Sequence, residues 1–162
     1  MTGGGHLLVG VGSEFRGDDR AGLIVARAVA AVPDSGWTVT EITADLSRLI
    51  TLWDGYDAVT VVDCARSSRQ APGTRLGFDG LTDDLPRDAF PASSHLLGLA
   101  EAVAMARALD QLPPQLTIEA IVGDRFETGT DPQTAVLETA AEVARALHPQ
   151  ATIAAGTANP HT

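Results

Sequence analysis

Several short stretches of the chain have the hydrophobic pattern of buried β-strands. Residues 7–11, 58–62 and 116–122 are largely apolar runs, as expected for strands covered on both faces of a parallel sheet. Residues 37–42 (WTVTEI) alternate in character from one position to the next, which predicts another strand. Residues 74–78 predict a further short strand at an edge of the sheet.

Between these stretches, apolar residues recur every three or four positions, which is the spacing of an amphipathic helix. The predicted helices span residues 18–31, 46–53, 94–109 and 132–147. Asp18 and Asp19 stand in the first turn of the first helix, where a negative charge suits the helix dipole. Ser93 and Ser94 are expected to cap the third helix.

The alternation of strands and helices predicts an α/β fold. We expect a three-layer sandwich in which helices cover both faces of a mostly parallel, twisted sheet. One domain is expected over residues 1–148, followed by a loose C-terminal tail over 149–162. In such sheets the functional site lies beyond the carboxyl ends of the strands, where the strand order reverses.

Composition narrows the range of partners. The 162 residues carry a net charge of −10, with 11 Lys and Arg against 21 Asp and Glu. We therefore expect no binding to nucleic acid or to an anionic membrane surface, because both are bound mainly through clustered cations. No apolar run approaches the ~20 residues of a membrane span. The single cysteine, Cys64, excludes an internal disulfide and fits a reducing compartment, so a cytoplasmic location is expected.

Two carboxylates and one imidazole are expected at the same edge of the sheet. Asp19 lies at the start of the first helix, Asp63 at the carboxyl end of the strand that begins at residue 58, and His95 at the start of the third helix. This ligand set suits Ni, Zn, Fe or Mn and leaves coordination positions open to other ligands. Each residue also has an ordinary structural explanation, as a helix or turn cap for the aspartates and as a surface histidine for His95. Spacing alone does not decide between the two.

Three other sequence features point less strongly to a function. Residues 10–15 (GVGSEF) partly match a dinucleotide-binding loop, but Phe15 replaces the third glycine and acidic residues follow where a pyrophosphate would bind. We expect these glycines to serve a tight turn and a close backbone approach. Cys64 with His95 would make a cysteine hydrolase, although a small apolar side chain at a strand end is the favoured interpretation. The aromatic-containing loop 125–129 either grips a partner or seals the sheet edge.

Three segments in register resemble the nickel–iron hydrogenase maturation endopeptidases. They are residues 9–22 (VGVGSEFRGDDRAG), residues 61–65 (VVDCA) with 71–74 (APGT), and residues 93–99 (SSHLLGL). The resemblance runs from about residue 7 to residue 148 in the expected order.

The resemblance implies a protease that removes the C-terminal extension of the hydrogenase large subunit after nickel has been inserted. Its metal-binding and catalytic residues would be Asp19, Asp63 and His95, the same three found at the sheet edge. The implied metal is nickel carried by the substrate, for which Zn or Cd could substitute in vitro. The implied partner is the large-subunit precursor. Either the metal activates the attacking water, or a carboxylate such as Asp19 or Asp18 acts as general base.

Some positions depart from the family pattern. Ser13 stands where asparagine is usual, Asp19 where glutamate is frequent, and residues 43–46 (TADL) replace a Gly-Thr-rich turn. These departures support an alternative, a non-catalytic nickel-checking or chaperone protein of hydrogenase assembly. A Cys64-dependent hydrolase is a further alternative, although many family members have alanine at that position.

Overall fold

The computed structural model describes residues 4–91 and 97–153. In chain order its elements are β1 (His6–Val11), the 3-10 turn η1 (Gly17–Arg20), α1 (Ala21–Ala30), β2 (Trp37–Ile42), the 3-10 turn η2 (Leu46–Arg48), α2 (Leu49–Leu52), β3 (Ala58–Ala65), β4 (Arg75–Asp79), α3 (Leu99–Ala108), β5 (Gln115–Val122) and α4 (Thr134–Leu147). Every strand and helix predicted from the hydrophobic pattern has a counterpart among them.

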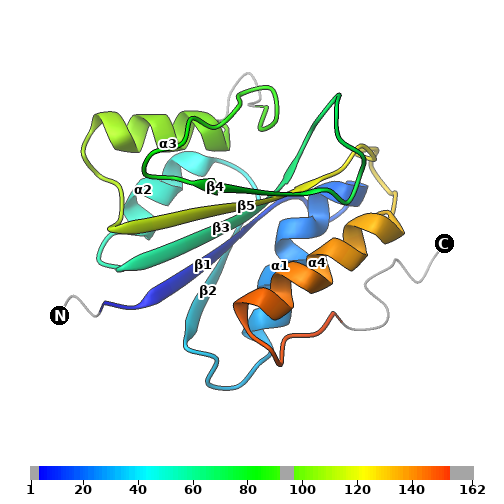
Figure 1. The fold of residues 1–162 in the computed structure, drawn as a ribbon, viewed down its shortest axis with the longest axis horizontal. Helices are drawn as coiled ribbons and strands as arrows, with labels where there is room; N and C mark the ends of the chain where they lie inside the picture. The colour runs from blue at the N-terminus through cyan, green and yellow to red at the C-terminus, as the bar shows by residue number, and fades with distance from the viewer. Residues whose placement is uncertain (1–3, 92–96, 154–162) are drawn as a thin grey trace.

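The strands of the described residues form one sheet in the order β2-β1-β3-β5-β4 (Figure 1). β1 pairs in parallel with β2 and β3, and β3 pairs in parallel with β5. β4 runs antiparallel to β5 at the edge, as the sequence predicts for residues 74–78. The chain passes from β1 through α1 to β2 on one side and then crosses to β3 on the other, so the strand order reverses at β1.

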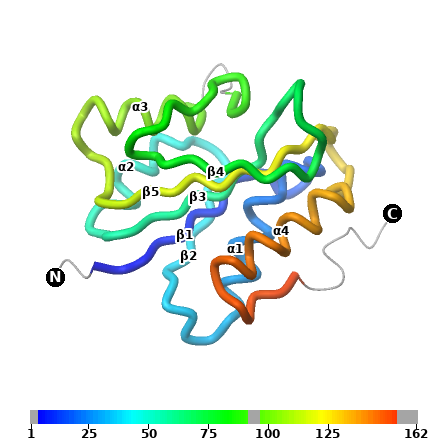
Figure 2. The backbone as a smooth tube through the Cα atoms, viewed as in Figure 1, coloured from blue at the N-terminus to red at the C-terminus, as the bar shows by residue number. Residues whose placement is uncertain are grey.

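Helices cover both faces of the sheet, which confirms the predicted three-layer arrangement. α1 and α4 pack on one face, and α2 and α3 lie on the other (Figures 1 and 2). Successive strand residues point to opposite faces. Leu7 and Val9 accordingly belong to the core beneath α2 and α3, whereas Leu8 belongs to the core beneath α1 and α4.

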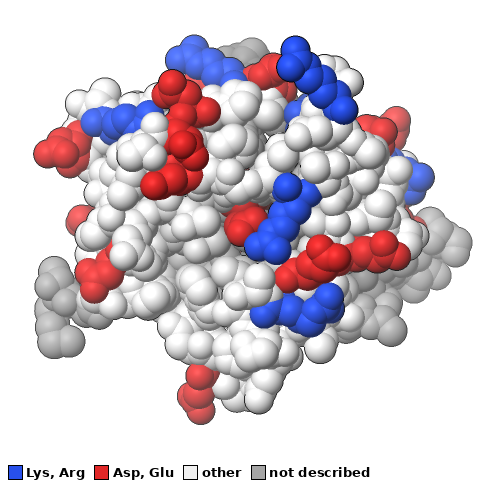
Figure 3. All heavy atoms as spheres, in the orientation of Figure 1, with Lys and Arg blue, Asp and Glu red and all other residues white. Residues whose placement is uncertain are grey.

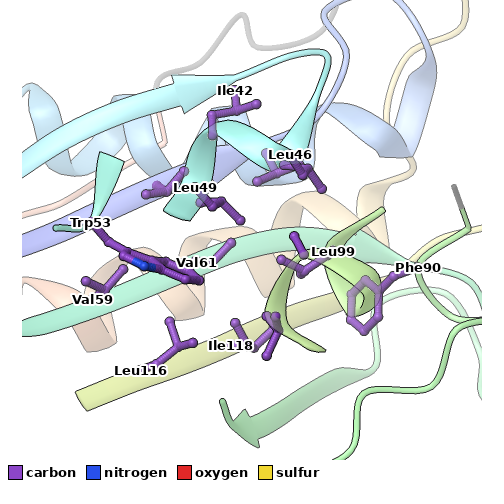
Figure 4. Close-up of a cluster of buried hydrophobic side chains, with 14 of the residues drawn as sticks. Ile42, Leu46, Leu49, Trp53, Val59, Val61, Phe90, Leu99, Leu116 and Ile118 are labelled. Atoms are coloured by element: carbon purple, nitrogen blue, oxygen red, sulfur yellow. The ribbon is translucent and has the colours of Figure 1, made fainter. Parts of the chain in front are cut away.

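The core beneath α2 and α3 is built around large aliphatic side chains and one tryptophan (Figure 4). Trp53 is 1% exposed, and its indole N–H donates to the carbonyl of Gln111 at 2.9 Å. This hydrogen bond satisfies the polar atom of a ring that is otherwise buried among apolar side chains.

Glycines let α1 lie close against the sheet. A Cβ on Gly22 would clash with the carbonyl oxygens of Val11 and Val62, and a Cβ on Gly10 would lie 2.5 Å from the carbonyl oxygen of Gly22. The expectation that glycines in residues 10–15 permit a close backbone approach is confirmed at Gly10.

Element boundaries differ from the prediction at three places near the site. α1 begins at Ala21, because residues 17–20 form η1 with Gly17 in a left-handed conformation (φ +55°). β3 continues to Ala65, because its last residues still pair with β5. α3 begins at Leu99 after an extended Gly98, so the predicted start at residue 94 is wrong.

Charged side chains of both signs are interspersed over the face shown in Figure 3. All 11 Lys and Arg positions of the sequence are arginines.

No helix in the described part of the chain is long and apolar enough to cross a membrane.

Candidate functional site

A pocket of about 210 Å³ lies at the carboxyl ends of β1 and β3, where the strand order reverses. Its walls come from the loop and turn after β1, the loop after β2, the end of β3, the segment before α3 and the loop between β5 and α4. Asp19 and Asp63 both line it, although 44 residues separate them in sequence. This is the position that the topology of a parallel sheet predicts for a ligand site.

Asp63 lies near the carboxyl end of β3, as predicted, two residues before the strand ends. The residue is 8% exposed, and its Oδ1 accepts a hydrogen bond of 2.8 Å from the backbone N–H of Cys64. Burial raises the pKa of the Asp63 carboxyl well above its usual range, and the charge of Asp19 raises it further; the Cys64 N–H opposes both effects. The protein therefore holds a carboxyl group in a site where its ionised form is costly.

Asp19 lies in η1 and is half-buried. Its backbone is held on both sides: its N–H donates to the carbonyl of Arg16, and its carbonyl accepts from the N–H of Ser13, each at 3.1 Å. Burial raises the pKa of its carboxyl, and the positive charges of Arg16 and Arg66 partly offset that increase.

Two partly or fully buried carboxyl groups in one pocket favour a cation, because a bound cation offsets both the desolvation and the mutual repulsion. No group of three or more His, Cys, Asp or Glu side chains able to hold a metal is found within residues 4–91 and 97–153. The third residue of the predicted trio, His95, lies outside the described residues. Asp19 and Asp63 are thus the two predicted ligands that the structure places, and it places them together.

Asp18 has a different position from its neighbour. Its side chain is fully buried and accepts four hydrogen bonds from the loop between β5 and α4. Its Oδ2 accepts from the backbone N–H groups of Asp124 (3.0 Å) and Arg125 (2.9 Å) and from Nε2 of Gln133 (2.6 Å), and its Oδ1 accepts from the backbone N–H of Gln133 (2.8 Å). A carboxylate so fully engaged ties η1 to that loop and is a poor candidate for a general base.

Cys64 points to the other face of the sheet from Asp63 and packs in the core beneath α1 and α4. It is 7% exposed. Burial raises the pKa of its thiol well above the usual range, and the negative charges of Asp63, Asp19 and Asp18 add to the effect. Since the thiolate is the nucleophilic form, these surroundings argue against a cysteine hydrolase.

The pocket also contains three residues that sequence reasoning did not assign to a site: Arg16, Arg66 and Phe126. Nε of Arg16 donates to the carbonyl oxygen of Phe126 at 3.1 Å, and the guanidinium carbon of Arg66 lies 4.3 Å from the centre of the Phe126 ring. The available sequence signal was position, because Arg16 lies in the loop after β1 and Arg66 directly follows β3. The aromatic loop 125–129, for which two roles were open, faces this pocket through Phe126.

Of the positions that depart from the sequence pattern described above, some line the pocket and others do not. Thr43, Ala44 and Leu46 from the substituted turn line it. Ser13 is not among the lining residues in the described part of the chain, and its N–H bond to the carbonyl of Asp19 requires no particular side chain.

Solved structures with the same fold include hydrogenase maturation endopeptidases. HybD from E. coli matches with a TM-score of 0.69 and 23% identity over 86% of each chain. The endopeptidase HycI from Escherichia coli matches with a TM-score of 0.71 and 19% identity over 93% of this chain and 97% of that one. The [NiFe] hydrogenase maturation protease HycI from Thermococcus kodakarensis KOD1 matches with a TM-score of 0.68 and 18% identity over 89% and 90%.

No protein-family model matches the sequence, and no curated protein matches it. At these identities the solved structures establish the fold, which is the fold that the sequence resemblance implies.

Proposed function

We propose that this chain is an endopeptidase that removes the C-terminal extension of a nickel–iron hydrogenase large-subunit precursor after nickel insertion. Asp19, Asp63 and His95 recognise the nickel, which arrives as part of the substrate. The protein acts in the cytoplasm, where the precursor is assembled.

One observation carries this proposal: Asp19 and Asp63 line the same pocket at the strand-order reversal of a fold shared with HybD and HycI. The shared fold covers 86% of this chain in the match with HybD and 93% in the match with HycI. Two carboxylates with an imidazole form an oxygen and nitrogen donor set that suits nickel and leaves room for ligands from the precursor. Zn or Cd would fit the same donors in vitro.

The pocket is small. A volume of about 210 Å³ is below the roughly 300–1,000 Å³ of typical small-molecule sites. In the proposed complex it would take only the residues next to the cut, with the remainder of the precursor on the protein surface. The nickel would fix the position of the peptide bond beside it, so that binding of the metal also orients the scissile bond for attack.

Asp19 is the better candidate for the proton-transfer step, because it is the more accessible of the two carboxylates. In the proposed reaction, water attacks the scissile carbonyl carbon and loses a proton to Asp19. The same proton then passes to the leaving amine as the C–N bond breaks.

The direct test in cells is the intact mass of the hydrogenase large subunit with and without this gene. We expect a heavier subunit, retaining its extension, in the deletion strain. The wild-type gene and Asp54→Asn, an exposed aspartate in the turn after α2, should restore the mature mass, whereas Asp63→Asn should not. A mature subunit in the deletion strain, or full restoration by Asp63→Asn, would contradict the proposal.

A further inference from the structure

The pocket of this acidic protein has two cationic side chains on its rim. Arg16 and Arg66 are exposed, and both line the pocket that contains Asp19 and Asp63. Their positive charges reach its interior, since both lower the pKa of Asp19.

Neither arginine is used in an ion pair within residues 4–91 and 97–153. Arg20, Arg27, Arg75, Arg87 and Arg107 have carboxylate partners within 4.0 Å. Arg16 and Arg66 influence Asp19 from a longer distance than a direct ion pair. Their positions are therefore not explained as contact partners of the pocket's own acids.

Phe126 holds both guanidinium groups in place. Its carbonyl oxygen accepts the Nε–H of Arg16, which leaves the two terminal nitrogens of that guanidinium as donors. Its ring packs against the guanidinium of Arg66, a contact that uses none of the conventional hydrogen-bonding capacity of that group. Arg66 is further fixed at its backbone, because its N–H donates to the carbonyl of Ala89 at 2.9 Å.

This arrangement matches what a carboxylate requires. A guanidinium presents paired N–H donors in a planar fork that fits the two oxygens of a carboxylate. Two such forks that are already positioned lose less side-chain entropy on binding than free surface arginines would.

We propose that Arg16 and Arg66 form a clamp on the rim of the pocket that binds a carboxylate of the precursor's C-terminal segment. The inference rests on the proposed function and deepens it by naming the chemistry that the protease selects. The carboxylate belongs either to an acidic side chain near the cut or to the end of the extension. The clamp residues bind and position the substrate and do not take part in bond cleavage.

Steady-state cleavage of a nickel-loaded precursor by purified protein tests the clamp. Arg16→Gln and Arg66→Gln should each raise KM by about five- to tenfold and change kcat by less than about twofold. Arg66→Lys keeps the charge without the fork and should recover only part of the loss. Phe126→Leu keeps the backbone carbonyl and should weaken the contribution of Arg66 more than that of Arg16. Arg69→Gln, an exposed arginine three residues further on that does not line the pocket, is the matched control and should behave as wild type.

Altered precursors identify the carboxylate. In one, the acidic side chains flanking the cut are replaced by their amides; in another, a short run of glycines moves the terminal carboxylate away. On the precursor that lacks the relevant carboxylate, the wild-type KM should rise and the arginine variants should cause no further loss, as in a double-mutant cycle.

The outcomes separate the two proposals. If wild-type protein does not cleave any nickel-loaded precursor, the proposed function and the clamp both fail. If wild-type protein cleaves but the arginine variants lose equally on all precursors, or lose nothing, the clamp alone is wrong and the arginines serve only to offset the charge of Asp19.

Discussion

Asp18→Asn should destabilise the protein, whereas Asp19→Asn should not. Asp18 is fully buried and accepts four hydrogen bonds through its two oxygens. Asparagine keeps the shape but has a single acceptor oxygen. In its better orientation that oxygen retains the three donors on the Oδ2 side, and its NH₂ group then faces the backbone N–H of Gln133.

The expected cost follows from these contacts. The variant loses one hydrogen bond to a charged acceptor, weakens three others to neutral strength and leaves one N–H facing a donor. Hydrogen bonds to charged groups contribute about 1.5–3 kcal/mol and neutral ones about 0.5–1.5 kcal/mol, and asparagine is in turn easier to bury. The net loss in the free energy of unfolding should be about 2–4 kcal/mol, which lowers Tm by about 5–15 °C for a chain of this size.

Thermal and urea unfolding followed by circular dichroism measure this loss. Asp19→Asn is the matched control: no described side chain or backbone group donates a hydrogen bond to its carboxylate, and burial already raises its pKa. It should leave Tm unchanged or slightly higher. A Tm for Asp18→Asn within about 1 °C of wild type, or an equal loss in both variants, would refute this account of the turn.

Three further changes test the site and its surroundings. Because the folded state raises the pKa of Asp63, the stability that its protonated form provides is complete below the ordinary carboxyl pKa and is lost as pH rises through the folded pKa. Asp63→Asn should therefore abolish cleavage and raise Tm at pH 7, and the gain in Tm should vanish near pH 4. A lower Tm for this variant at pH 7 would contradict the reasoning. Cys64→Ala should cost about 1 kcal/mol of stability through a small cavity and keep full cleavage activity; loss of activity in the folded variant would revive the cysteine-hydrolase alternative. Gly22→Ala should lower the free energy of unfolding by about 2–3 kcal/mol, because its Cβ meets two backbone carbonyls, whereas Gly77→Ala on β4 has free space and serves as control in the same denaturant titration.

Much of the fold follows from hydrophobic pattern alone. The apolar runs that became β1 and β3 are buried on both faces, so each is recognisable without knowledge of its neighbours. In β5 both faces are buried only near the carboxyl end of the strand. The alternation of strands with amphipathic helices then restricts the topology to a parallel sheet with helices on both sides. That topology predicts Asp19 and Asp63 at the same edge of the sheet, and both line one pocket there.

Other features depend on partners distant in sequence. Asp18 and Asp19 are identical residues at adjacent positions, yet one anchors a loop and the other lines the pocket. The donors to Asp18 lie 106–115 residues away, so no local pattern separates the two. The end of β3 was predicted too early for the same reason, because pairing with β5 and not hydrophobicity sets it.

The residues on the rim of the pocket could not be predicted from the local sequence either. Arg16, Arg66 and Phe126 come from three separate loops, and each has an ordinary polar or aromatic loop context in the sequence. Only the contacts of Phe126 with both guanidinium groups show that the three residues lie together.

The most direct test of the central claim is the mass of purified large-subunit precursor after incubation with purified protein, with and without nickel in the precursor. The account predicts loss of the C-terminal extension from the nickel-loaded precursor with wild-type protein, and no loss with nickel-free precursor or with Asp19→Asn or Asp63→Asn. A nickel-loaded precursor that binds the protein yet keeps its full mass would contradict the protease and indicate a protein that checks nickel without cutting.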